Sequence, residues 1–431
     1  NELNYNYDEL GRVESSNINN LYNTKVEYVT NGNRTSQLIR NIISGEDTYS
    51  YKYDKLNNIT HIYYNGKLKN RYYYDKLSEL IKEKDYFLNI IIKYNYDNLG
   101  NILSKITYDL DTYSIINIDK YSYNNWEDLL SKYNDDEIVS DSIGNPVSIG
   151  TDINLNWVNG RQLDSYSDTS KTVFYRYNVD GNRISKKING VETTYYLEDN
   201  DIIYEKTGNN VLYYIRSTMD DLVGLKYNNN LYYYLKNAQG DIIGILDSTF
   251  NVIARYEYDS WGKILSITDN NGNDISNDIN NIANINPYRY RSYYYDKETG
   301  LYYLNSRYYN PEWGRFINAD SHITTGQGFN SYNMFCYCAN NPINKADLSG
   351  MFWEKVGKFL KKAGKKLKKA LEPIGNLFKA IGTVASNMVG VSSTKKTVIN
   401  TSSYTFVPDP LPITVKTGTK ENTVISKKGN S

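Results

Sequence analysis

Side chains that commonly ligate metals or act as strong nucleophiles are scarce in this chain. Its 431 residues include two histidines and two cysteines, Cys336 and Cys338. Disulfide scaffolds and cysteine-rich zinc sites need more ligands than these. Nothing in the sequence specifies a metal ion or a soluble cofactor.

Three arginines stand among tyrosines in one dense segment: Arg289, Arg291 and Arg307. Arginines mixed with aromatic residues are also typical of proteins that stack on single-stranded nucleic acid. The surrounding part of the chain is acidic, which opposes phosphate binding. We therefore expect no nucleic-acid partner, and we expect these arginines to stack on rings or pair within a sheet.

Charge divides the chain into two parts. Its 49 basic and 49 acidic residues cancel overall, but residues 351–431 hold 15 lysines, no arginine and 4 acidic residues. The net charge is therefore +11 after residue 350 and −11 before it. An acidic body precedes a basic tail.

The composition predicts an all-β protein. Tyrosine occurs 46 times, against 10 phenylalanines and 4 methionines. Tyrosine suits the pleated, half-buried surface of a strand, whereas helical proteins depend more on leucine, alanine and methionine. An all-α fold is excluded.

A tyrosine–aspartate motif recurs along the chain, as in NYNYDELGR at 4–12 and KYNYDNLGN at 93–101. Tyr-x-Tyr places two rings on one face of a strand, and the Asp-x-x-Gly that follows favours a turn. Aligned tyrosines recur at intervals of 21, 25, 21 and 22 residues, namely Tyr7, Tyr28, Tyr53, Tyr74 and Tyr96. Each unit is about one hairpin, and successive hairpins predict a continuous, spiralling antiparallel sheet. A sandwich or propeller is the alternative, but no four-stranded unit recurs.

Changes of pattern divide the chain into four expected regions. Residues 1–286 carry the repeats, 287–350 are denser in tyrosine, 351–391 are basic and amphipathic, and 392–431 are rich in Thr, Ser and Lys. The chain begins at Asn1 in the middle of the repeat pattern. We therefore expect the repeat region to be truncated at its N-terminal side.

Two long stretches of the dense segment carry a family resemblance: YYYDKETGLYYLNSRYYNPEWGRFINAD at 293–320 and SYNMFCYCANNPINKAD at 331–347, followed by Gly350. They resemble the RHS repeat-associated core domain of RHS and TcC-type toxins and their teneurin-like relatives. The upstream repeats extend this resemblance over residues 1–350. It implies a β-shell of YD repeats that is closed by the core domain and encloses a variable C-terminal polypeptide.

In many members of that family the core domain is an aspartyl autoprotease that frees the C-terminal segment. By this resemblance Asp320 and Asp347 are the catalytic aspartates, Arg315 is the neighbouring arginine, and Gly350–Met351 is the scissile bond. Two carboxylates held together can share a proton, so that one is a base toward water and the other an acid toward the amide.

The chain departs from the family's D-P-x-G-L signature. Ser321 follows Asp320, Leu348 follows Asp347, and Met351 replaces leucine. Loss of a proline frees the backbone torsion that it would fix. The alternative interpretation is that both aspartates only cap turns or pair with the arginine.

The basic tail begins with FWEKVGKFLKKAGKKLKKAL at 352–371, whose apolar residues follow helical spacing and whose lysines fill the opposite face. Such a helix is typical of binding to an anionic membrane surface, and the acidic inner wall of the shell is the alternative contact. The residues expected to make this contact are Trp353, Lys361, Lys362, Lys365 and Lys366. Residues 351–431 lack His, Cys and Arg, which excludes nuclease, deaminase and zinc chemistry within them.

The resemblance implies the C-terminal part of a bacterial toxin shell, secreted or at the cell surface, that encapsulates and delivers its own C-terminal segment. Self-cleavage near Gly350 would release that segment. The expected partners are the enclosed segment, an anionic membrane and a cognate immunity protein. The alternative is a wall-associated adhesin whose outward tyrosines bind carbohydrate without cleavage.

Overall fold

The computed structural model describes residues 2–347 except 20–21, 30–33, 43–44, 125–127, 218–219 and 321–332, together with 349–350 and the backbone of 354–355 and 414–415. The chain divides into two units. The strands of the first unit pair antiparallel in order, and β33 pairs parallel with the first of them. They are β1 (Glu2–Tyr7), β2 (Val13–Ile18), β3 (Tyr22–Tyr28), β4 (Thr35–Ile42) and β33 (Thr414–Val415).

The second unit contains most of the long sheet, in which neighbouring strands pair antiparallel from β5 to β21 and from β22 to β26. This confirms the predicted all-β, antiparallel hairpin array. The strands are β5 (Gly45–Tyr53), β6 (Ile59–Tyr64), β7 (Lys67–Tyr74), β8 (Leu80–Asp85), β9 (Ile90–Tyr96), β10 (Ile102–Asp109), β11 (Ile115–Tyr123), β12 (Leu130–Tyr133), β13 (Asp136–Ser140), β14 (Pro146–Ile149), β15 (Ile153–Val158), β16 (Gln162–Ser167), β17 (Thr172–Tyr177), β18 (Arg183–Ile188), β19 (Val191–Glu198), β20 (Asp201–Thr207), β21 (Asn210–Arg216), β22 (Leu222–Tyr227), β23 (Asn230–Lys236), β24 (Ile242–Leu246), β25 (Val252–Tyr258) and β26 (Ile264–Thr268).

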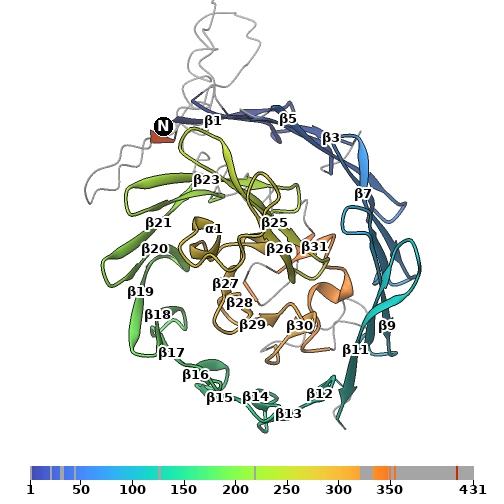
Figure 1. The fold of residues 1–431 in the computed structure, drawn as a ribbon, viewed down its shortest axis with the longest axis vertical. Helices are drawn as coiled ribbons and strands as arrows, with labels where there is room; N and C mark the ends of the chain where they lie inside the picture. The colour runs from blue at the N-terminus through green and yellow to red at the C-terminus, as the bar shows by residue number, and fades with distance from the viewer. Residues whose placement is uncertain are drawn as a thin grey trace, which may run out of the picture. The chain divides into compact units, whose positions relative to one another are not determined.

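The elements that follow β26 in the chain, from α1 to β32, are together called the compact segment. Within the second unit the long sheet curves around this segment (Figure 1). Four of its short strands form a separate antiparallel sheet, β27 (Tyr294–Asp296), β28 (Leu301–Tyr303), β29 (Tyr308–Asn310) and β30 (Arg315–Phe316). Its other elements are α1 (Ile282–Ile285), the 3-10 turns η1 (Tyr290–Ser292) and η3 (Cys338–Asn340), and the pair β31 (Lys345–Ala346) and β32 (Glu354–Lys355). The exact domain boundaries stay a prediction. Of the predicted basic helix, the structure describes only Glu354–Lys355, which pair as strand β32 with β31 rather than in a helix, and the rest lies outside the described residues.

The aspartate of each repeat forms the hairpin turn, as the sequence predicts. Asp97 accepts hydrogen bonds at Oδ1 from the backbone N–H groups of Leu99 and Asn101, both at 2.9 Å. Gly100 of this turn has a φ of +77°, a left-handed conformation that suits glycine. The same pair of side-chain bonds recurs in the turns that start at Asp8, Asp54, Asp75, Asp141, Asn178, Asn237, Asp247, Asp259 and Asp269.

The tyrosine that precedes the turn links neighbouring hairpins. Tyr96, at the end of β9, donates its hydroxyl to the backbone carbonyl of Leu80 at the start of β8, at 2.6 Å. The paired register between these strands reaches only Lys82, so the Leu80 carbonyl lies beyond the ladder. Equivalent bonds join Tyr28 to Val13, Tyr74 to Ile59, Tyr123 to Ile102, Tyr177 to Leu163 and Tyr258 to Ile242.

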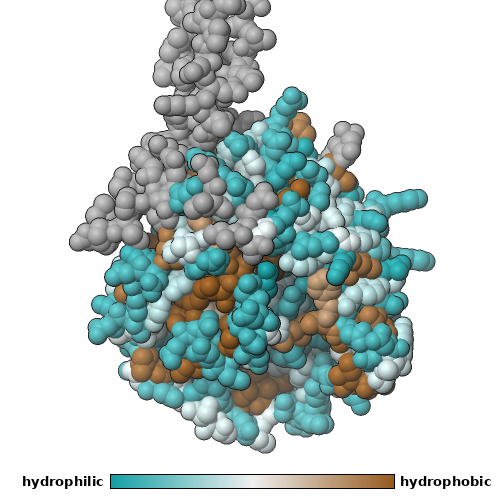
Figure 2. Space-filling view, turned by 45° about the horizontal axis from the view of Figure 1, so that its top comes forward, coloured by the Kyte–Doolittle hydropathy of each residue, from teal (hydrophilic) through white to brown (hydrophobic). Residues whose placement is uncertain are grey.

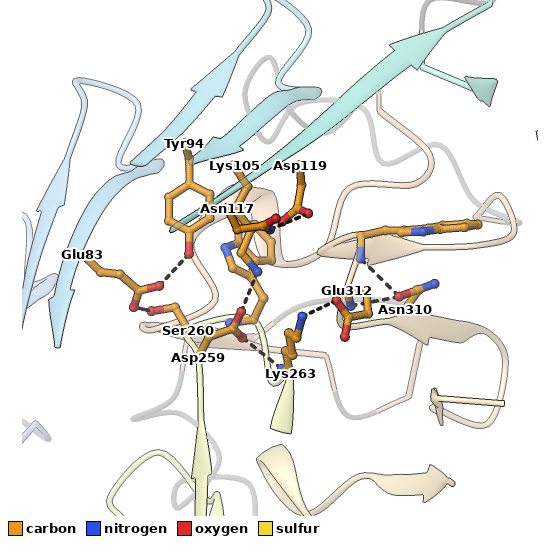
Figure 3. Close-up of polar contacts among 12 residues, drawn as sticks. Glu83, Tyr94, Lys105, Asn117, Asp119, Asp259, Ser260, Lys263, Asn310 and Glu312 are labelled. Carbon is orange, nitrogen blue, oxygen red and sulfur yellow. Dashed lines mark hydrogen bonds and ion pairs between the residues drawn. The ribbon is translucent and has the colours of Figure 1, made fainter. Parts of the chain in front are cut away.

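Early and late strands of the second unit meet through two ion pairs, one partly exposed and one buried. Lys69 of β7 binds Glu257 of β25 at 2.6 Å, and Lys105 of β10 binds Asp259, which follows β25, at 2.7 Å. We call these contacts, together with those that Glu83 makes nearby, the seam; Figure 3 shows the part of it around Glu83, Lys105 and Asp259. It joins segments that are more than 150 residues apart in the sequence.

Glu83 lies at the centre of the seam and is 4% exposed. It accepts a hydrogen bond from the Tyr94 hydroxyl at 2.6 Å and another from the Ser260 hydroxyl. Burial is the main reason that the pKa of Glu83 rises to about 7, and the nearby Asp259 raises it further.

A buried ion pair anchors the compact segment to the long sheet. Arg183 of β18 donates to Asp296 of β27, with Nη2 and Oδ1 3.0 Å apart. The Arg183 guanidinium lies 4.2 Å from the ring centroid of Tyr303, and Lys186 also binds Asp296 at 3.1 Å. On the face drawn in Figure 2, hydrophilic residues dominate the projecting surface and hydrophobic ones lie in patches between them.

The tyrosine–carbonyl bond gives a first prediction. Tyr96→Phe removes the hydroxyl and leaves the Leu80 carbonyl without that donor, so we expect the free energy of unfolding to fall by about 1–3 kcal/mol. Chemical denaturation would measure it. Tyr73→Phe, on the other face of the nearby β7, is the matched control and should change the free energy by less than about 0.5 kcal/mol. Equal effects would contradict the linking role.

Glu83 gives a prediction about pH. Because its pKa in the folded protein is about 7 and its ordinary value is 4.5, the folded state binds the proton more tightly. Stability should therefore fall as pH rises through this range, by about 3 kcal/mol from this group. Glu83→Gln should remove that part of the slope, whereas Glu192→Gln on β19 should keep it. Denaturation series at pH 5, 6, 7 and 8 would measure the slope, and an unchanged slope in Glu83→Gln would contradict the assignment.

Candidate functional site

One buried arginine joins the two aspartates that the family resemblance selects. Arg307 directly precedes β29, Asp320 follows β30, and Asp347 follows β31. The Nη2 atom of Arg307 lies 3.1 Å from Oδ2 of Asp320 and 3.1 Å from Oδ2 of Asp347. The two carboxylates therefore meet at a single nitrogen atom.

Contacts within the compact segment hold these groups in place. The backbone N–H of Asp320 donates to the carbonyl of Met334 at 2.9 Å, and that of Asp347 donates to the Tyr293 hydroxyl at 2.9 Å. The Arg307 guanidinium lies 3.5 Å from the Phe316 ring centroid and donates through Nη1 to the Met334 carbonyl at 3.2 Å. These contacts fix the orientation of the arginine.

The same arginine binds the carbonyl group of Gly350. Its Nε donates to that oxygen, while the Ser306 hydroxyl donates to the neighbouring carbonyl of Ser349 at 2.8 Å. Gly350 has a φ of +69°, and a Cβ there would lie 2.6 Å from the Leu304 carbonyl oxygen. Only glycine fits, and its carbonyl faces the arginine that holds both carboxylates.

Two opposing effects act on the charge of Arg307, namely its burial and the two carboxylates beside it. Burial lowers the pKa of Arg307, and the carboxylates of Asp347 and Asp320 counteract it. Asp347 has a side-chain exposure of 3% and Asp320 one of 15%. This arrangement can polarise a peptide carbonyl, and it offers one carboxylate close to solvent and one away from it.

The structure brings together Asp320, Asp347 and Gly350 but places Arg315 elsewhere. Arg315 donates to the backbone carbonyl of Asp128 and lies 5.0 Å from the ring centroid of Tyr123. The arginine that contacts the aspartates is Arg307. The remaining expected residues, Met351, Trp353, Lys361, Lys362, Lys365 and Lys366, lie outside the described residues.

For Arg307 the sequence predicts only that it stacks on a ring or pairs within the sheet. It stacks on Phe316, but it also carries the ionic contacts of the site. A signal is present in the sequence, because a buried arginine in an aromatic segment needs counter-charges and two aspartates follow it. Spacing alone does not show which of the two nearby arginines faces them.

Two further properties concern the described part of the chain. Within it, no group of three or more His, Cys, Asp or Glu side chains is arranged to hold a metal ion. None of its helices has the length and hydrophobicity needed to cross a bilayer.

Comparison with known sequences identifies relatives over more than half of this chain. No protein-family model matches the chain. The tRNA3(Ser)-specific nuclease WapA of Bacillus spizizenii is 32% identical over 288 residues, which cover 64% of this chain and 12% of the relative. The tRNA nuclease WapA of Bacillus subtilis is 31% identical over the same length and the same shares. The chain thus spans 12% of the length of these curated relatives.

Solved structures share the fold. A TcdB2–TccC3–Cdc42 crystal structure matches 83% of this chain and 19% of its own, with a TM-score of 0.66 and 21% identity. The Photorhabdus luminescens Tc holotoxin pore matches 80% and 19%, with a TM-score of 0.63 and 20% identity. The fold is therefore that of a Tc-type β-shell. In its YD motifs, its WapA relatives and its fold, the chain is similar to RHS/YD-repeat shell proteins.

The ionic site gives a prediction about stability. Arg307→Met leaves two carboxylates facing each other without their cation, so we expect a loss of roughly 3–5 kcal/mol at pH 7. Adding Asp347→Asn to Arg307→Met should recover part of the loss at pH 7. Chemical denaturation at pH 7 would measure these changes, and a double variant no more stable than Arg307→Met would assign the effect to packing.

Proposed function

We propose that this chain is the closing part of a bacterial toxin shell, secreted or at the cell surface, that cleaves its own backbone between Gly350 and Met351. The observation that carries this proposal is the contact of Arg307 with both aspartates and with the Gly350 carbonyl. The role first expected for Arg315 passes to Arg307, because Arg307 has the required contacts.

Each residue of the site then has a definite part in the hydrolysis. Asp320, the more exposed carboxylate, takes a proton from a water molecule as the water oxygen bonds to the Gly350 carbonyl carbon. Arg307 stabilises the negative charge that develops on the carbonyl oxygen. A carboxylic acid of the pair then gives a proton to the Met351 nitrogen as the C–N bond breaks. The products are a Gly350 carboxylate and a free Met351 amine.

The segment after Gly350 is the proposed cargo. One of the matching structures is TcdB2–TccC3 without its hypervariable C-terminal region, so a variable C-terminal segment is a feature of a protein with the same fold. The Bacillus relatives are tRNA nucleases, but residues 351–431 here lack His and Arg and carry 15 lysines. We assign this cargo to anionic membranes, with a cognate immunity protein as the expected antagonist.

The adhesin alternative draws little support from the outward tyrosines. Tyr196 is 41% exposed, but its ring is stacked on that of Tyr204 with the centroids 4.0 Å apart. Tyr213 continues the ladder at 5.1 Å from Tyr204. Each of these rings covers part of its neighbour and Tyr204 lies between the other two, so the ladder leaves less flat ring surface on which a sugar could stack.

Intact mass of the purified chain tests the cleavage. We expect fragments 1–350 and 351–431 from the parent, and uncut chain from Asp320→Asn and Asp347→Asn. Arg307→Lys should slow the cut by about 100-fold or more, because it loses the Nε donor to the carbonyl. Arg315→Lys is the matched control and should cut at the parental rate.

Gel filtration tests the enclosure. The two fragments should elute together under native conditions and separate in denaturant. An uncut parent between pH 5 and 8, or cutting that persists in both asparagine variants, would refute the proposed protease. Fragments that separate without denaturant would refute enclosure while leaving the cut itself intact.

A further inference from the structure

A row of basic side chains crosses the outer face of four consecutive strands, β5 to β8. The strand register places Lys52 opposite His61, His61 opposite Arg71, and Arg71 opposite Lys84. Directly paired residues project from the same face of a sheet, at the strand separation of about 4.8 Å. The row therefore presents four basic side chains at nearly regular intervals.

A second, shorter row runs beside the first, where Lys82 of β8 pairs with Lys93 of β9. Both rows lie on the face opposite the buried Tyr72 and Tyr94, and Tyr94 is the ring that contacts Trp261 at the seam. They therefore point away from the compact segment that the sheet surrounds. We call the following residues the basic rows: Lys52, His61, Arg71, Lys82, Lys84 and Lys93.

This arrangement is unfavourable for the isolated sheet. Like charges directly opposite each other destabilise a strand pair. In the part of the chain that the structure describes, no carboxylate lies within ion-pair distance of any member of the basic rows. The acidic residues of β8, Glu83 and Asp85, are buried on the other face. The rows concentrate positive charge on a body whose net charge is −11.

His61 responds to this local charge. Burial lowers the pKa of its imidazole, and the neighbouring Arg71 and Lys52 lower it further. Its Nδ1 also contacts the Thr60 hydroxyl at 3.0 Å. An anion placed over the rows would oppose the effect of the two cations and raise the pKa of His61.

The tyrosines between the basic side chains narrow the class of ligand. The Lys82 ammonium lies 3.8 Å from the Tyr73 ring centroid, and that of Lys93 lies 4.7 Å from the Tyr108 centroid. With these ring faces occupied, neither a nucleic-acid base nor a flat sugar face has a platform on which to stack. The site favours charge without aromatic stacking.

The curvature of the sheet narrows the class of ligand further. The second unit's sheet bends around the compact segment, so the outer face is convex along the direction of the rows (Figure 1). A flat bilayer would touch only part of such a face. A flexible linear polymer can follow the curve and meet every basic side chain in turn.

We propose that the basic rows bind a linear, non-aromatic polyanion that carries regularly repeated phosphate groups with one negative charge each, laid across strands β5 to β9. Binding brings anions between directly opposed cations and so relieves their mutual repulsion. The proposal is independent of self-cleavage, since the rows lie on the outer face and share no residue with the Arg307 site.

Binding of long-chain inorganic polyphosphate to the full chain tests the proposal. At about 0.1 M salt we expect Arg71→Glu combined with Lys84→Gln to weaken binding by about tenfold or more, and the affinity of the parent to fall steeply as salt rises. The double variant should fold at least as well as the parent, because both substitutions remove like charges that directly oppose each other. Lys206→Gln, an exposed lysine on β20, is the matched control and should bind like the parent.

The lysine-rich residues 351–431 are present in every variant, so binding through them alone would leave the double variant unchanged and overturn the proposal. The same comparison is made with single-stranded DNA and with phosphatidylglycerol vesicles. If the double variant loses more affinity for one of these than for polyphosphate, the proposal is overturned in favour of that ligand. A second readout is the NMR titration of His61, one of only two histidines in the chain. Polyphosphate should raise its pKa, and an unchanged value would contradict contact with the rows.

Discussion

The hydrogen bond from a repeat tyrosine to the backbone carbonyl at the start of the adjacent strand is the contact on which the long sheet depends. The pairing between β8 and β9 ends before the Leu80 carbonyl, and the carbonyl of a residue as buried as Leu80 cannot turn to water. The phenolic hydroxyl of Tyr96 reaches it, whereas a phenylalanine would leave it without this donor. This requirement gives one physical reason why the chain contains 46 tyrosines and only 10 phenylalanines.

A sheet that is rich in tyrosine can bury charged side chains in its interior. Tyrosine rings surround cations with their faces and supply hydroxyls to polar groups, so Arg183 and Asp296 can pair between the long sheet and the compact segment. The seam holds a second buried pair, Lys105 with Asp259. Polar contacts are directional, so they fix how the segments meet more narrowly than apolar packing alone would.

Local rules are readable from the sequence, and long-range pairing is not. The Asp-x-x-Gly turns and the alternation of tyrosines depend on neighbouring residues only, which is why the hairpin array is predicted correctly. The selection between Arg307 and Arg315 depends on which backbone segments lie against Met334 and Asp128, and these contacts join distant parts of the chain. The seam escapes prediction for the same reason, because its members are ordinary strand and turn residues until the strands meet.

The candidate site depends on long-range pairing rather than on local sequence, and this has a consequence for its function. Arg307, Asp320 and Asp347 arrive on three separate segments, and the Gly350 carbonyl reaches the arginine only when the backbone adopts its left-handed turn. None of these segments can form the site alone, since each group is held by backbone contacts to another segment. Any chemistry at Gly350 therefore has to follow assembly of the compact segment. Because that segment is anchored to the long sheet through Arg183, a cut made there would be made on a folded shell rather than on a nascent chain.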